Sequence, residues 1–82
     1  MTVKMQEKLA QVVADGDSEK AKIFALKVVK EGLDLPTCIT GAREGLQRAG
    51  RLHASGEYLL ADLFNSTDAM KIALGILEKA SN

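Results

Sequence analysis

The chain of 82 residues is long enough for one small domain, and its 46% hydrophobic and 27% charged residues are ordinary for a globular protein. Eleven basic and eleven acidic side chains cancel, which disfavours nucleic acid as a partner because phosphate binding needs a basic face. No apolar run approaches the roughly 20 residues of a membrane helix. The first residues lack the apolar core of a signal peptide, and the single cysteine, Cys38, has no partner for a disulfide. We therefore expect a cytoplasmic protein.

Apolar residues recur at helical spacing along the whole chain, and no window alternates as a strand would. The first helix is predicted over residues 3–14. The second is predicted over residues 18–31, with Asp17 or Ser18 as its N-cap. Glycines that commonly end helices follow each of the first three predicted segments: Gly16, Gly32 and Gly56.

The third helix is predicted over residues 35–54 and the fourth over residues 58–80. Asp34 is a suitable N-cap for the third helix, and Pro36 falls in its first turn, where a missing N–H does no harm. Residues 66–68 are weak helix formers, so the fourth helix can bend there. Four helices with short connections pack most simply as an antiparallel bundle, so the predicted fold is an all-α four-helix bundle.

Glycine inside a helix costs up to about 1 kcal/mol relative to alanine. The third predicted helix contains three such residues, which suggests that its backbone approaches a neighbour closely: Gly41, Gly45 and Gly50. The chain has no Cys/His cluster with metal-ligand spacing, no phosphate-binding loop and no nucleophile motif. We therefore predict no metal site and no catalytic residue, and we expect that the chain is not an enzyme by itself.

The segment AGRLHASGEYLLADLFNSTDAMKIALGIL, residues 49–77, carries a family pattern. That pattern is Val-Gly-x-Leu-Phe, a glycine turn, Phe-Leu-Pro-x-Leu, a Ser-Ala pair and Met-Lys. The matching residues are, in order, Gly50, Leu52, Gly56, Leu60, Leu63, Ser66, Met70 and Lys71. On these residues the chain resembles the helical cap module of cobalamin-dependent methyl-transfer proteins. That family includes the corrinoid proteins of methanol and methylamine metabolism and the cobalamin module of methionine synthase.

The resemblance covers residues 17–80, and the chain departs from the pattern at three points. His53 stands where the family has an aromatic residue, Ala61 replaces the proline of Leu-Pro, and Thr67 replaces the alanine of Ser-Ala. The change of the proline affects the entry to the fourth helix. The change to histidine concerns the face that would meet the cofactor.

The resemblance implies a fold like the cap domain of methionine synthase, which rests on the upper face of the corrin ring and shields the methyl–cobalt bond. In such proteins a following α/β domain binds cobalt from below through an Asp-x-His-x-x-Gly motif, which does not occur in this sequence. We therefore treat residues 1–82 as a single cap domain without the α/β domain. The implied cofactor is cobalamin in the full-length protein, with no tight binding by this chain alone. The implied partners are the α/β domain and methyltransferases.

The resemblance implies that the corrin contacts His53, Leu59, Leu60 and Leu63. Helical spacing alone places Leu63 and Phe64 in the bundle core, and a solvated histidine at a helix end is the other interpretation of His53. Tyr58 and Glu57 are expected at the rim of the site. Cys38 and Met70 are expected in the core.

Two other functions fit the same residues. One is a stand-alone interaction module that has lost the cofactor and binds a partner, or forms a homodimer, through the exposed cap face. The other is a light- or redox-sensing cobalamin regulator, although such proteins usually carry a DNA-binding domain and this neutral chain shows none.

Overall fold

The computed structural model describes residues 2–81, so the outer ends of the predicted domain, Met1 and Asn82, lie outside the described residues. It contains four helices: α1 (Thr2–Ala14), α2 (Ser18–Glu31), α3 (Leu35–Ala54) and α4 (Leu60–Ala80). No strand occurs between residues 2 and 81, and the prediction of an all-α fold is confirmed. The fourth helix begins at Leu60 and not at residue 58, because Leu59 is still extended, with φ −75° and ψ 165°.

The predicted caps form for local reasons. The Asp17 carboxylate accepts a hydrogen bond from the Lys20 amide at 3.0 Å, and the Asp34 carboxylate accepts one from the Thr37 amide at 3.0 Å. The Thr37 hydroxyl also donates to Asp34, and these two bonds lower the pKa of that carboxyl. The three predicted helix-ending glycines all have positive φ: Gly16 (71°), Gly32 (65°) and Gly56 (87°).

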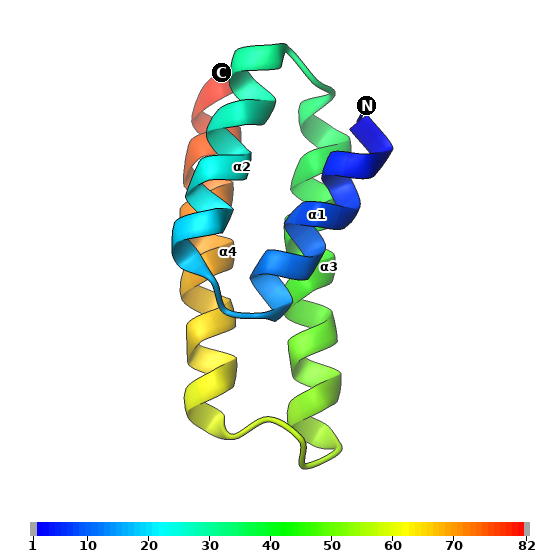
Figure 1. Ribbon diagram of the computed structural model, residues 1–82, viewed down its shortest axis with the longest axis vertical. Helices are drawn as coiled ribbons and strands as arrows, with labels where there is room; N and C mark the ends of the chain where they lie inside the picture. The colour runs from blue at the N-terminus through cyan, green and yellow to red at the C-terminus, as the bar shows by residue number, and fades with distance from the viewer. Residues whose placement is uncertain (1, 82) are drawn as a thin grey trace.

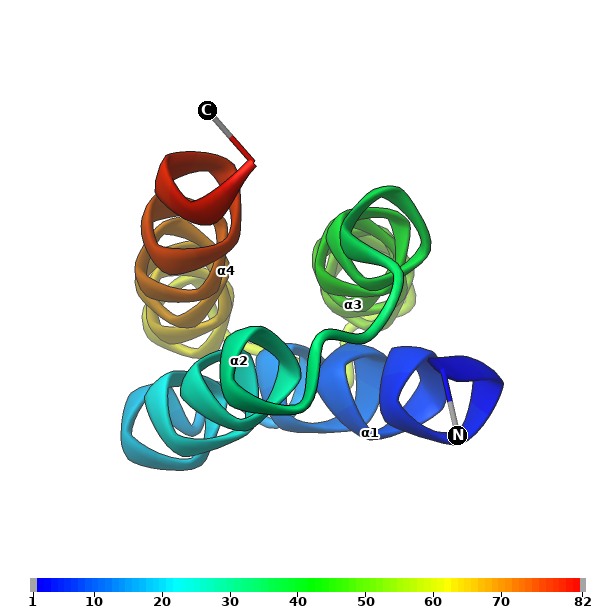
Figure 2. The same ribbon diagram turned by 90° about the horizontal axis from the view of Figure 1, so that it is seen from above.

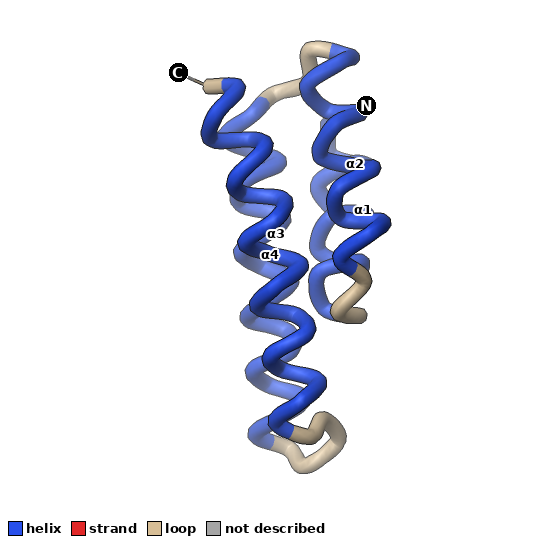
Figure 3. The backbone as a smooth tube through the Cα atoms, turned by 90° about the vertical axis from the view of Figure 1, so that its left-hand side faces the viewer, coloured by secondary structure: helices blue, strands red, loops and turns tan. Residues whose placement is uncertain are grey.

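Successive helices run in opposite directions, as predicted for the bundle (Figure 1). The closest packing joins α1 to α3 and α2 to α4, pairs whose members run the same way, and α3 also packs on α4. Seen from above and from the side, α1 and α2 form one layer and α3 and α4 the other (Figures 2 and 3).

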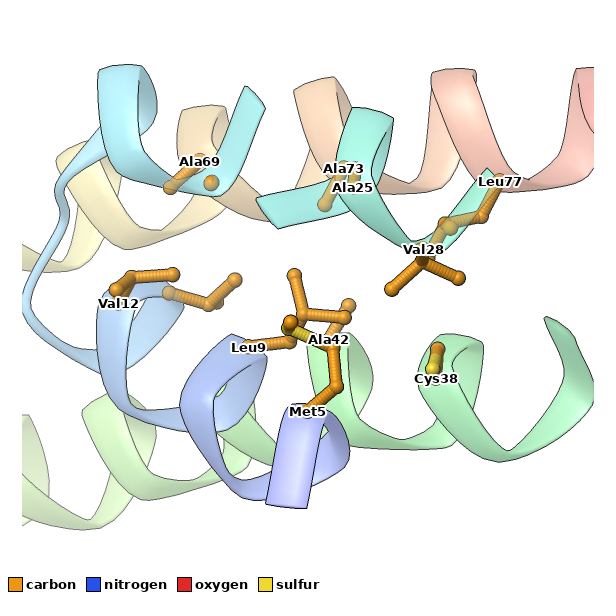
Figure 4. Close-up of a cluster of buried hydrophobic side chains, with 12 residues drawn as sticks. Met5, Leu9, Val12, Ala25, Val28, Cys38, Ala42, Ala69, Ala73 and Leu77 are labelled. Carbon is orange, nitrogen blue, oxygen red and sulfur yellow. The ribbon is translucent and has the colours of Figure 1, made fainter. Parts of the chain in front are cut away.

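The core lies between the two layers and is built from medium and small side chains (Figure 4). Its largest fully buried side chains include Leu9 and Val13 of α1, Val28 of α2 and Leu77 of α4. Cys38 is buried as predicted, and this burial, with the negative charge of Asp34, raises the pKa of its thiol. The cysteine is therefore a neutral core residue and not a reactive one.

Two of the three helix-interior glycines in α3 are explained by close packing against α1. A Cβ on Gly41 would lie 2.5 Å from the Gln6 carbonyl oxygen, and one on Gly45 would lie 2.5 Å from the Val13 Cβ. For Gly50 the prediction was wrong, since a Cβ there would meet no atom within 4 Å. Gly50 lies about 140° around the helix from Gly45 and faces open space, whereas Ala49, close to the Gly45 face, is fully buried.

The helices differ in length, and this difference gives the molecule two unlike ends. α1 and α2 contain 13 and 14 residues, whereas α3 and α4 contain 20 and 21. At 1.5 Å per residue, a difference of seven residues corresponds to roughly 10 Å of helix. The α3–α4 hairpin extends beyond the other layer at one end (Figure 1). We call residues 50–65 the tip and the other described residues the base. None of the residues of the tip is buried.

Candidate functional site

The tip is a tight connection between two long helices. The Leu52 carbonyl accepts the amides of Glu57 (2.9 Å) and Tyr58 (3.0 Å), and also the Ser55 hydroxyl (2.9 Å). Gly56, with φ 87°, supplies the left-handed conformation that reverses the chain direction. The connection is thus held largely by hydrogen bonds within residues 52–58.

His53 takes part in holding this connection. Its side chain is exposed, and Nδ1 donates a hydrogen bond to the Tyr58 carbonyl oxygen at 3.0 Å. The donor must be the ring nitrogen, because a carbonyl oxygen can only accept. This hydrogen bond fixes the ring beside the connection. The histidine is exposed at the helix end, as one interpretation of the sequence expected, but it also has a defined hydrogen-bond partner.

The start of α4 exposes three large apolar side chains. Leu59, at the N-cap, is 72% exposed, and Leu60 and Phe64 are 52% and 59% exposed. Leu60 and Phe64 are four residues apart and therefore lie on one helix face. N-cap positions normally carry Ser, Thr, Asp or Asn, so an exposed leucine there gives up a capping hydrogen bond. Only the reverse bond forms, from the Leu59 amide to the Asp62 carboxylate at 2.9 Å.

The core prediction for Phe64 was wrong. The buried face of α4 is defined by a stripe of mostly small residues, namely Ser66, Ala69, Ala73 and Leu77. Phe64 lies two residues before Ser66, which is about 200° around the helix at 3.6 residues per turn. Apolar residues also surround the first turns of α4, so helical spacing alone did not distinguish this stripe from the face that bears Phe64. Leu63 is half-buried, and among the described residues it is not one of the side chains that pack on the core cluster.

The opposite end of the molecule offers a different kind of surface. A hollow of about 230 Å³ is lined by Val28, Val29, Gly32, Leu33, Leu35 and Ala80. This volume is below the roughly 300–1,000 Å³ of typical ligand pockets. Within residues 2–81 no group of three or more His, Cys, Asp or Glu residues could hold a metal ion, and no helix is long and apolar enough to cross a membrane.

Comparison with known proteins assigns the fold to a family. The model of the B12 binding domain matches residues 5–78 of this chain. The chain belongs to the B12 binding domain family. A corrinoid protein of Desulfitobacterium hafniense (strain Y51) is 35% identical over 79 residues, which are 95% of this chain and 37% of that relative. The domain thus spans little more than a third of the relative's length. No solved structure gave a significant match.

The predicted resemblance to the helical cap domain of corrinoid proteins is therefore confirmed. The tip presents exposed apolar side chains, and the described residues offer no cluster of metal ligands. Exposed apolar side chains of this kind favour contact with another apolar surface, because such contact removes them from water.

Proposed function

We propose that this B12 binding domain is the cap of a corrinoid protein that carries methyl groups, and that its tip covers the upper face of the corrin. The observation that carries this proposal is the exposure of Leu59, Leu60 and Phe64 on a tip without a single buried residue. Exposed apolar groups of this kind mark sites of interaction in soluble domains. The family membership and the corrinoid relative supply the chemical class of the ligand.

The residues of the tip would have separate roles. Leu59 and Leu60 would lie against the ring, and Leu63, half-buried behind them, would support their helix. Phe64 would extend the same apolar face along α4. His53 would stand at the edge of the covered area, with its orientation set by the bond to the Tyr58 carbonyl.

The domain itself would perform no bond chemistry. When bound, the cofactor supplies the metal that carries the methyl group. The leucines of the tip exclude water from that face, and the cap must move aside when a partner needs access, which is the function of a lid. We expect the partners to be an α/β domain that holds the cobalamin and methyltransferases that exchange the methyl group. We expect the setting to be the cytoplasm.

Weak binding of cobalamin by the isolated chain is part of this proposal, because the tip supplies only one of the surfaces that the cofactor would need. The test is a nuclear magnetic resonance titration of the isotope-labelled chain with methylcobalamin. Amide signals of the tip should shift progressively without saturating at low concentration, and those of α2 should not.

A matched pair of substitutions makes this test specific. Leu60→Asp should abolish the shifts, because a carboxylate cannot be buried against an apolar ring without a large desolvation cost. Leu26→Asp is the control, since Leu26 on α2 is 49% exposed, nearly the same as Leu60 at 52%. Shifts centred on α2, equal loss in both variants, or no shifts in the unsubstituted chain would contradict the proposal.

A second candidate function rests on the same exposed side chains. If the domain acts as a stand-alone interaction module, the tip would mediate a symmetric homodimer. Sedimentation of the unsubstituted chain should then show a dimer that Leu60→Asp weakens and Leu26→Asp preserves. A monomer at all concentrations would exclude this function and leave the cap proposal untouched.

A further inference from the structure

The C-terminal end of α1 is connected to the tip through one carbonyl group. The last four carbonyls of a helix have no partner in a following turn of the same helix and need other donors. Three of them accept amides of the α1–α2 connection: Gln11 from Asp15, Val12 from Asp17 and Val13 from Gly16, each at 2.9 Å. The fourth, that of Ala14, accepts two hydroxyl groups, from Tyr58 at 2.8 Å and from Ser66 at 3.0 Å.

Both hydroxyls reach this carbonyl from the α3–α4 hairpin. Ser66 is the one polar side chain among the described residues that is buried, and its hydroxyl is satisfied only through Ala14. Gly16 packs directly beside it, since a Cβ on Gly16 would lie 2.8 Å from the Asn65 Cβ. The α1–α2 connection therefore closes over the hairpin where the tip begins.

Tyr58 makes the corresponding contact from within the tip. Partial burial, together with the negative charges of Asp15, Asp62 and Glu57, raises the pKa of its phenol. The hydroxyl therefore stays protonated and remains a donor at neutral pH. Tyr58 and Ser66 lie on either side of the segment that bears the exposed leucines, so the two bonds fix both ends of that segment to α1.

We propose that Tyr58 and Ser66 are positioning residues that orient Leu59 and Leu60 toward the corrin by binding the shared carbonyl of Ala14. This inference rests on the proposed function. The tip has no buried residue of its own, so core packing alone does not hold its angle to the base. The two hydroxyl groups that bind the Ala14 carbonyl restrain that angle. Tyr58 and Ser66 lie 44 and 52 residues from Ala14 along the chain.

Hydrogen exchange of backbone amides tests the restraint without any cofactor. Tyr58→Phe removes one oxygen atom and keeps the ring. It should speed the exchange of tip amides, such as those of Tyr58 and Leu63, about two- to tenfold, the effect of losing one net hydrogen bond. Amides of α2 should exchange at unchanged rates. Ser66→Ala should act in the same direction.

The control is a hydroxyl that makes a bond of the same kind within a single helix. Thr67 donates to the Leu63 carbonyl at 3.0 Å inside α4, so Thr67→Val removes a hydroxyl but no link to α1. It should leave exchange in the connection between α3 and α4 unchanged. Unchanged exchange of the tip in Tyr58→Phe, or equal acceleration in tip and base, would overturn the proposal.

The positioning role is then tested by repeating the methylcobalamin titration with Tyr58→Phe. The shifts of Leu59 and Leu60 amides should be weakened, although neither side chain has changed. If exchange accelerates as expected and the shifts persist at full size, the hydroxyls restrain the tip without orienting it, and the positioning role is wrong. If the unsubstituted chain shows no shifts, the proposed function itself fails, and a role toward the corrin fails with it.

Discussion

The α3–α4 hairpin passes through both ends of the molecule and meets different surroundings at each. In the base it packs against α1 and α2 through small residues, and the glycines at positions 41 and 45 let the backbones touch. In the tip the same two helices have no opposing layer, and none of their side chains is buried. Large apolar side chains are exposed in both regions, but at the tip three of them lie within six consecutive residues. Those of the base are spread along three helices: Val3, Ile23, Leu26, Val29 and Ile72.

The difference indicates which residues serve stability and which serve binding. A position that violates a local rule without a compensating contact inside the fold is a candidate for function. Leu59 in place of a polar N-cap and Gly50 in an open helix interior are two such positions, and both belong to the tip. In the base, by contrast, the glycines at 41 and 45 have a visible packing reason.

The largest expected effect is a difference in stability between substitutions of a buried leucine in the base and an exposed leucine at the tip. Leu9→Ala should lower the free energy of unfolding by about 2–5 kcal/mol, because it leaves a cavity in the core where Leu9 is fully buried. Leu60→Ala should change it by no more than about 0.5 kcal/mol, as expected of exposed positions. Urea unfolding followed by circular dichroism measures both. Equal losses would show that the tip is part of the stabilising core.

Two glycines in α3 should respond in opposite directions. Gly45→Ala should destabilise the domain by about 1–3 kcal/mol, because its Cβ would lie 2.5 Å from the Val13 Cβ and 2.6 Å from the Ala10 carbonyl oxygen. Gly50→Ala should stabilise it by about 0.5–1 kcal/mol, since alanine favours the helix and the space is open. Urea unfolding measures both changes. A lower stability of Gly50→Ala would contradict the open space around Gly50.

Replacing the N-cap leucine should separate stability from binding. Leu59→Ser should raise stability by about 1 kcal/mol, because its hydroxyl completes a capping box with Asp62. The melting temperature should rise by roughly 4–8 °C for a domain of this size. The methylcobalamin shifts should nevertheless weaken. Leu59→Ala is the control that loses the side chain without gaining the cap, and a serine variant that gains stability and keeps full shifts would remove Leu59 from the site.

The smallest expected effect is a pH response of opposite sign in the two regions. The pKa of Asp34 in the base is lowered, so its stabilising contribution is present above its unfolded pKa of about 4 and is lost as the pH falls through the folded value. The pKa of Tyr58 in the tip is raised, so its contribution is present below about pH 10 and is lost as the pH rises through the folded value.

Each group can be followed directly. The chain has one tyrosine and no tryptophan, so ultraviolet absorbance titrates Tyr58 alone. Its midpoint should be higher in the folded chain than in denaturant. For Asp34, carbon-detected magnetic resonance should give a lower midpoint in the folded chain than in denaturant. Thr37→Val should bring the pKa of Asp34 back toward its ordinary value. Identical midpoints in folded and denatured chains would contradict these assignments.

Local signals in the sequence determined the helices of this domain. Caps at Asp17 and Asp34 and a left-handed glycine after each of the first three helices act within a few residues. The predicted boundaries therefore agree with the structure except at the starts of α1 and α4, which differ by one and two residues. The unequal helix lengths follow from the same signals, and they already imply a hairpin that outreaches the other layer. The order of matching residues around Gly56 was enough to predict the family.

Only the tertiary structure decided which faces are buried and what holds the tip. Apolar residues occur all around the first turns of α4, so periodicity could not show that Ser66 faces the core while Phe64 faces out. Gly45 and Gly50 look alike in the sequence, and they differ because Gly45 faces α1 whereas Gly50 faces open space. The bonds from Tyr58 and Ser66 to the Ala14 carbonyl join residues more than forty positions apart. Such contacts depend on how the layers pack, because no short-range rule relates residues so distant along the chain.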